Sequence, residues 1–166
     1  MAYSDMDTLL TNIQTALVGN TTLDTWCDTN YSKAVKVFIG TDMREPPGES
    51  DDPCVGLYPA RQTSGYGEEA ITKTICVSCE VFNDDKTNAT NGTTGATSTI
   101  YDGVTELEQF RQAVLTVVKG MSDSDRGGRI DKVDTVYEVV AFFPQFTCDM
   151  FMEIVEDLYQ GSDPIV

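Results

Sequence analysis

The spacing of apolar residues predicts two amphipathic helices. Over residues 6–18 apolar side chains recur at helical intervals, and Ser4 or Asp5 precedes them as a candidate cap. Gly19-Asn20 is expected to end this helix. A second helical pattern follows Asp102, a candidate cap, and ends at Gly120. The apolar positions are Met6, Leu9, Leu10, Ile13 and Leu17 in the first pattern, and Val104, Leu107, Phe110, Val114 and Val118 in the second. The polar face of the second is expected to carry Glu106, Glu108, Gln109, Arg111 and Gln112.

Other segments have the patterns of strands. Over Glu69–Phe82 apolar and polar residues alternate, as in a sheet with one solvent-facing side. Ala34–Ile39 and Cys54–Tyr58 are rich in apolar and β-branched residues, and Pro59 is expected to end the latter. The closing strands are predicted at Thr135–Phe143 and Phe146–Val155, joined near Pro144; Met150, Ile154 and Leu158 would also suit a helix. Thr22–Cys27 is predicted to add a helical turn, with Trp26 in the core.

Three polar segments are predicted to be loops. Thr41–Pro53 contains three prolines and several acids, and Met121–Gly128 is polar and glycine-rich. Asn83–Thr99 is a long Asn/Thr/Gly stretch, and loops of that length are usually functional or mobile. The order of elements does not alternate strand and helix. We therefore predict one α+β domain over residues 1–166, with two main helices on one face of a mainly antiparallel sheet and a mobile loop at about 83–99.

Charge narrows the possible partners. The chain has 11 Lys and Arg against 27 Asp and Glu, a formal net charge of −16. Tight nucleic-acid binding needs clustered basic residues, whereas the nearest cluster here is interrupted by acids. That cluster is Lys119, Arg126, Arg129 and Lys132, with Asp123, Asp125 and Asp131 among them. No apolar run approaches the length of a membrane span, so a membrane protein is not expected. The first seven residues lack the basic start and following apolar run of a signal peptide, so secretion is not expected either. The five cysteines have no framework spacing and are expected to be free thiols.

Candidate chemistry is sparse. The chain has no histidine, the commonest general base and zinc ligand. Asp42/Glu45 and Asp51/Asp52 lie in a segment expected to be solvated, where a raised pKa is not expected. Cys76 and Cys79 form C-x-x-C inside a predicted strand, so their side chains should point to opposite faces. The segment after Asp123 has part of a calcium-loop pattern, but it lacks the third acidic ligand and the final Glu. We predict no catalytic residue, cofactor or metal.

Several sequence segments, and their order along the chain, resemble the tail terminator (tail completion) proteins of long-tailed bacteriophages. These proteins are similar in beginning with an amphipathic helix, followed by a strand, a proline-rich acidic loop, a long strand, a central helix and closing strands. The residues that carry the resemblance are Met6–Val18, Val35-Lys36-Val37-Phe38-Ile39-Gly40, Arg44-Glu45-Pro46-Pro47, Asp52-Pro53-Cys54-Val55-Gly56-Leu57-Tyr58-Pro59 and Phe143-Pro144-Gln145-Phe146.

The resemblance implies a homo-oligomeric ring, a hexamer in that family, that caps the tail tube and joins it to the neck or head connector. It implies assembly in the host cytoplasm, a place in the virion tail or neck, and a lumen through which DNA passes without tight binding. Candidate assembly residues lie in the predicted loops: Arg44, Glu45, Asp51, Asp52, Asn88, Asn91, Asp123, Asp125 and Arg126. The alternatives are another phage structural subunit (head-closure or tube protein), an acidic intracellular adaptor or inhibitor, and an enzyme that uses carboxylates or thiols.

Overall fold

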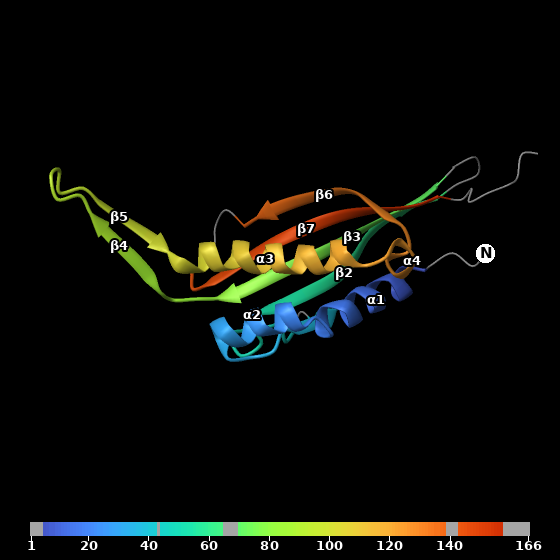
Figure 1. Ribbon diagram of the computed structural model, residues 1–166, viewed down its shortest axis with the longest axis horizontal. Helices are drawn as coiled ribbons and strands as arrows, with labels where there is room; N and C mark the ends of the chain where they lie inside the picture. The colour runs from blue at the N-terminus through green and yellow to red at the C-terminus, as the bar shows by residue number, and fades with distance from the viewer. Residues whose placement is uncertain (1–4, 43, 65–69, 139–142, 158–166) are drawn as a thin grey trace, which may run out of the picture.

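A five-stranded sheet forms the centre of the fold (Figure 1). The structure is a computed structural model and describes residues 5–42, 44–64, 70–138 and 143–157. The strands of the sheet are β1 (Lys36–Ile39), β2 (Cys54–Thr63), β3 (Ala70–Phe82), β6 (Arg129–Tyr137) and β7 (Gln145–Asp157). Their order across the sheet is β1-β2-β3-β7-β6; β1 and β2 are parallel, and the other neighbours are antiparallel. The α+β prediction, with a mainly antiparallel sheet, is confirmed.

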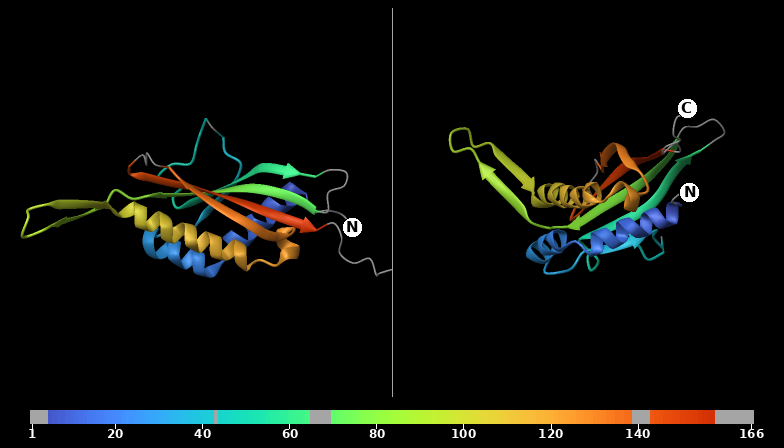
Figure 2. Two further views of the ribbon diagram at one scale, coloured as in Figure 1. Left: turned by 90° about the horizontal axis from the view of Figure 1, so that it is seen from above. Right: turned by 45° about the vertical axis from the view of Figure 1, so that its right-hand side comes forward.

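Three longer helices cover one face of the sheet, and the segment between β1 and β2 lies on the other side (Figure 2). The helices are α1 (Met6–Val18), α2 (Thr21–Tyr31) and α3 (Asp102–Gly120), and a single turn, α4 (Asp123–Arg126), follows α3. Their apolar faces meet the side chains of β3 and β7 in one core. Fully buried members of this core include Leu9, Ile13, Leu17, Phe110, Val114, Ile75, Val77, Met150 and Met152. No described helix combines the length and the hydropathy of a membrane span.

Helix caps explain where the first two helices begin. The Asp5 carboxylate accepts a hydrogen bond from the Thr8 backbone N–H at 2.7 Å and caps α1. The Asn20 side chain caps α2 in the same way through the Leu23 N–H, at 2.9 Å. Because of this cap and the stacking of Trp26 on Phe110 at 5.3 Å, α2 is longer than the single turn that was predicted.

The third helix differs from its prediction at its start and in which side chains it buries. Tyr101, and not Asp102, occupies the cap position, and it makes no side-chain cap bond. Instead the Asp102 carboxylate accepts a hydrogen bond from the Thr87 hydroxyl at 3.1 Å. Val104, predicted to be in the core, is 56% exposed, whereas Arg111, predicted to be on the polar face, is 8% exposed. The buried face of the helix therefore differs from the predicted apolar stripe at these two positions. Arg111 lies over the sheet near Met150.

The long central strands follow the predicted alternation. Every second residue of β3 from Ile71 to Val81 is buried, and β3 pairs with β7 through all thirteen of its residues. Because of that pairing the last apolar segment is a strand, and the helical alternative is wrong for the residues described. Two other boundaries were also wrong. β6 begins at Arg129 rather than Thr135, and β2 continues beyond Pro59, where β1 no longer pairs and an edge tolerates proline.

Candidate functional site

A β-hairpin projects beyond the end of the sheet at one end of the molecule (Figures 1 and 2). Its strands are β4 (Lys86–Thr90) and β5 (Thr97–Tyr101), and all ten strand residues are exposed. We call it the arm. The prediction of an irregular loop over Asn83–Thr99 was therefore wrong, because threonine-rich sequence pairs readily as strands. Within the described residues each arm strand pairs only with the other, so the arm presents two free edges.

Two predicted assembly residues build the arm itself. The Asn91 side-chain oxygen accepts hydrogen bonds from the backbone N–H groups of Thr93 and Thr94, at 2.9 and 3.1 Å, and thereby shapes the tip. The Asn88 side chain accepts a hydrogen bond from the Thr99 hydroxyl across the hairpin at 2.7 Å. Gly95, with φ of 71°, provides the left-handed residue that the turn needs. The outer part of the arm therefore takes its shape from bonds within the hairpin.

Exposed apolar side chains gather where the arm joins the body. The Tyr101 ring contacts Phe143 at 5.1 Å between centroids, and Phe143 contacts Phe146 at 6.4 Å. The Lys86 ammonium lies 4.5 Å from the centre of the Phe143 ring. Beside them, a cavity of about 330 Å³ opens between the start of α3 and strands β6 and β7. We call this region the arm-base patch; its exposed members are Tyr101, Val104, Tyr137 and Phe143.

A carboxylate at the rim of this cavity has a strongly lowered pKa. Glu108 accepts two hydrogen bonds from the Arg111 guanidinium, at 2.9 and 2.5 Å, and others from Gln112 and Tyr137. The Arg111 bonds are the main reason that the pKa of Glu108 falls to about 2. Since Arg111 is buried, Glu108 compensates a charge that would otherwise be costly.

Replacing Glu108 with glutamine is expected to lower the free energy of unfolding by about 1 kcal/mol at pH 7, a value reduced for the solvent screening of a side chain that is 43% exposed. The folded-state pKa lies below the ordinary 4.5, so the stabilisation is complete above about 4.5 and disappears as pH falls through about 2. Urea unfolding over this pH range measures it, with Glu138→Gln on the same rim as control. A wild-type advantage that does not shrink in acid would contradict this role for Glu108.

The predicted loop after α3 contains the helical turn α4, which buries one predicted assembly residue. Arg126 is 6% exposed and its guanidinium donates to backbone carbonyls, so it belongs to the interior rather than to a contact surface. Asp123 forms an ion pair with it. The Asp125 carboxylate accepts a hydrogen bond from the Ser122 hydroxyl at 2.6 Å. Asp123 and Asp125 are therefore both exposed to solvent and both already paired within their own subunit.

The segment between β1 and β2 divides into an exposed part and a buried end. Arg44 pairs with Asp42 at 2.7 Å in solvent, and Glu45 is also exposed. Asp51 pairs with Lys36 at 2.5 Å. Asp52, in contrast, is 1% exposed. The expectation that Asp52 is solvated was wrong, because this end of the segment folds back onto the sheet.

The buried side chains of Asp52 and Cys54 form a cluster with Glu80, which is half-buried. One ligand-capable atom from each residue lies within 4.8 Å of the other two. Neither carboxylate oxygen of Asp52 has a hydrogen-bond partner among the residues that the structure describes. Burial raises the pKa of Asp52 to about 6, opposed by the interaction with the Cys54 thiol, and burial and the Asp52 charge raise that of Glu80 to about 7. Burial also raises the pKa of the Cys54 thiol. Sequence reasoning missed Cys54 and Glu80 because only sheet pairing brings them together.

The other thiols are arranged as predicted. All five cysteines are free. Cys79 is buried in the core and Cys76 is partly exposed on the opposite face of β3, as the strand prediction required. Cys79 lies opposite Cys148 in the neighbouring strand. The C-x-x-C pair therefore does not form a single two-thiol site.

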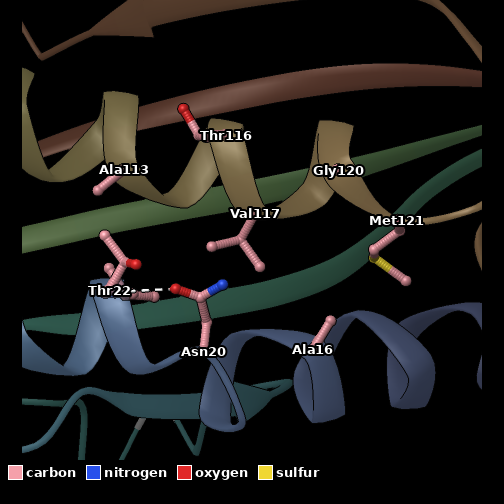
Figure 3. Close-up of a pocket in the computed structure, with 9 residues that line it drawn as sticks. Ala16, Asn20, Thr22, Ala113, Thr116, Val117, Gly120 and Met121 are labelled. Atoms are coloured by element: carbon pink, nitrogen blue, oxygen red, sulfur yellow. Dashed lines mark hydrogen bonds between the residues drawn. The ribbon is translucent and has the colours of Figure 1, made fainter.

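A further cavity of about 470 Å³ lies between α1, α2 and α3 (Figure 3). Its walls are mainly small or apolar side chains, among them Ala16, Ala113 and Val117. The Asn20 oxygen at its edge is already used as the cap of α2. These groups offer shape but no reactive chemistry.

The sequence matches no protein-family model and no curated protein.

Proposed function

We propose that this chain is a structural subunit of a bacteriophage virion, forming a homo-oligomeric ring that terminates the tail tube and joins it to the neck. The arm is the observation that carries the proposal. Its strands are wholly exposed and have free edges, so it contributes little to the core of its own subunit. An exposed, well-shaped hairpin of this kind is suited to a neighbouring chain, which it can contact through both its backbone edges and its side chains.

The placement of the arm favours a head-to-tail contact. The arm lies at one end of the molecule, and the start of α1 and the turn α4 lie at the other (Figure 1). A contact between two different surfaces repeats around an axis and closes into a ring when the rotation permits. The arm-base patch provides apolar surface next to the arm, which a neighbour would cover.

The negative charge of the chain is compatible with DNA passing through the lumen of such a ring. The sheet face away from the helices carries the carboxylates of Asp149 and Glu153, and the whole chain has a net charge of −16. A lumen with these charges repels phosphates and lets DNA pass without tight binding. The remaining partners in this proposal are the tail tube protein on one side and the neck or connector protein on the other.

Light scattering over a range of protein concentrations tests the ring. We expect a discrete species, near six copies of the 18.2 kDa subunit. Long tubes would instead favour a tube protein. A monomer at every concentration would contradict a ring that forms in solution.

A shortened arm tests the contact that we propose. Removing the cross-strand pairs Asn88↔Thr99 and Ala89↔Ser98 shortens the arm by about 7 Å but keeps the tip and the strand alternation. We expect this variant to lose the oligomer and to keep the wild-type unfolding temperature, since no core residue changes. A variant that still forms the ring would show that the arm is not the contact. The control substitutes Thr90 and Thr97 with Val, which preserves arm length.

A further inference from the structure

We propose that Asp52, Cys54 and Glu80 form a binding site for a zinc ion. The proposal goes beyond the assembly role and does not depend on it. Asp52 is the main evidence, because it is 1% exposed and both of its carboxylate oxygens lack a hydrogen-bond partner among the described residues. A buried carboxylate in this condition is costly, and such groups normally pair with a cation or coordinate a metal.

The backbone places the other two groups beside it. Cys54 and Glu80 lie directly opposite each other in the β2–β3 pairing. Both alternate with residues of the core, so they point to the sheet face that the segment between β1 and β2 covers. The Glu80 carboxylate accepts a hydrogen bond from the Gln145 amide. This bond orients Glu80, as hydrogen bonds to metal-binding carboxylates commonly do.

The three ligand atoms favour zinc over harder cations. Zinc accepts thiolate and carboxylate ligands together, whereas magnesium and calcium prefer oxygen alone. Ordinary zinc–ligand bond lengths in a tetrahedron separate a sulfur and an oxygen by about 3.6 Å. The atoms here lie within 4.8 Å of one another, so side-chain movements of about 1 Å bring them to that geometry.

A cavity borders two of the three proposed ligands. Cys54 and Glu80 line a cavity of about 440 Å³, together with Gly56, Ser78 and Tyr58. The Tyr58 ring lies over Gly56, and its hydroxyl is hydrogen-bonded to Thr41. This cavity provides both an entry path and room for a water molecule as the fourth ligand. Zinc bound there would fasten the segment between β1 and β2 to the sheet.

Cobalt and zinc titrations of the metal-stripped protein test the site. Co²⁺ is expected to give thiolate-to-metal charge transfer and tetrahedral visible bands, and Zn²⁺ should displace it. Zinc binding should also release a proton from the Cys54 thiol and raise the unfolding temperature with metal concentration. A protein without these responses would overturn the proposal.

Variants identify the ligands. Cys54→Ala should abolish the charge-transfer band, and Asp52→Asn and Glu80→Gln should each weaken zinc binding at least tenfold. Gln145→Leu, which removes only the orienting bond, should weaken it about 10–100-fold. Cys76→Ala is the matched control, because the pKa of the Cys76 thiol is raised by burial and by a neighbouring carboxylate, Asp149. Loss of the band in Cys76→Ala, or its retention in Cys54→Ala, would overturn the assignment.

The thermal stability of Asp52→Asn distinguishes a loss of metal binding from a loss of the fold. Without metal, this variant should unfold at a higher temperature than the wild type, because it removes a buried charge whose two oxygens accept no hydrogen bond from the described residues. At a zinc concentration that saturates the wild type but not the variant the order should reverse, since the wild type then gains more from the metal. A variant less stable than the wild type in both conditions would mean that Asp52 serves packing alone, and would overturn the proposal.

Discussion

Replacing Arg126 with methionine is expected to lower the free energy of unfolding by about 3 kcal/mol, because several buried or part-buried carbonyl groups and the Asp123 carboxylate lose a charged donor. The Arg126 guanidinium donates to the backbone oxygens of Val118 at 3.1 Å, Met121 at 2.7 Å and Gly128 at 3.2 Å. It thereby satisfies the end of α3 and joins it to the start of β6. Methionine keeps much of the apolar stem but supplies no donor, so the part-buried carbonyls of Met121 and Gly128 lose this bond and Val118 keeps only the long one from the Met121 N–H, at 3.4 Å.

Arg129→Met is the matched control for this substitution. Arg129 lies three residues further on, is half exposed, and is 3.6 Å from its partner Asp131. Surface pairs of this kind contribute little, so we expect a change within about 0.5 kcal/mol. Guanidinium unfolding of both variants measures the difference. Equal losses in the two variants would contradict the structural role of Arg126 and would return it to the candidate contact surface.

The sequence predicted those elements in which burial is periodic. In β3, the side chains from Ile71 to Val81 alternate between core and solvent, so the hydrophobic pattern marks the strand almost to its ends. The same holds for α1, where Leu9, Ile13 and Leu17 define one buried face. Such patterns exist because one face of each element lies against the core.

Elements without a buried face left no such pattern. All residues of β4 and β5 are exposed, so no alternation distinguishes the arm from a polar loop. Its remaining signals are the many threonines, which favour strands, and the Asn-rich turn. The start of β6 is hidden for the same reason, since Arg129, Asp131 and Lys132 lie along an edge strand with most side chains in solvent.

The acid–thiol cluster could not be predicted from local sequence. Asp52 lies among acids and prolines, a composition typical of solvated loops, and only contact with the sheet buries it. Glu80 comes from β3, which pairs with β2. What sequence reasoning lacked was the three-dimensional register that places Glu80 opposite Cys54.

Replacing Gly128 with alanine is expected to cost more than about 3 kcal/mol of folding free energy, because the new methyl group has no space and the backbone is strained. A Cβ atom there would lie 2.4 Å from the Val155 carbonyl oxygen and 2.7 Å from its carbon. The residue also has φ of 144°, a conformation that glycine adopts far more readily than alanine. Since the clash is with backbone, no side-chain rotation relieves it, and β6 must move away from β7.

Gly120→Ala provides the control, since a Cβ atom at the last residue of α3 meets nothing within 4 Å. Alanine is the better helix former, so this variant should be more stable by up to about 1 kcal/mol. Chemical unfolding gives both values, and amide exchange locates the damage. In Gly128→Ala we expect faster exchange along β6 and the paired part of β7, with β3 protected until global unfolding. Unchanged exchange at β6 would mean that the chain accommodates the methyl group elsewhere, and that the close approach of Gly128 to Val155 does not hold the edge strand in place.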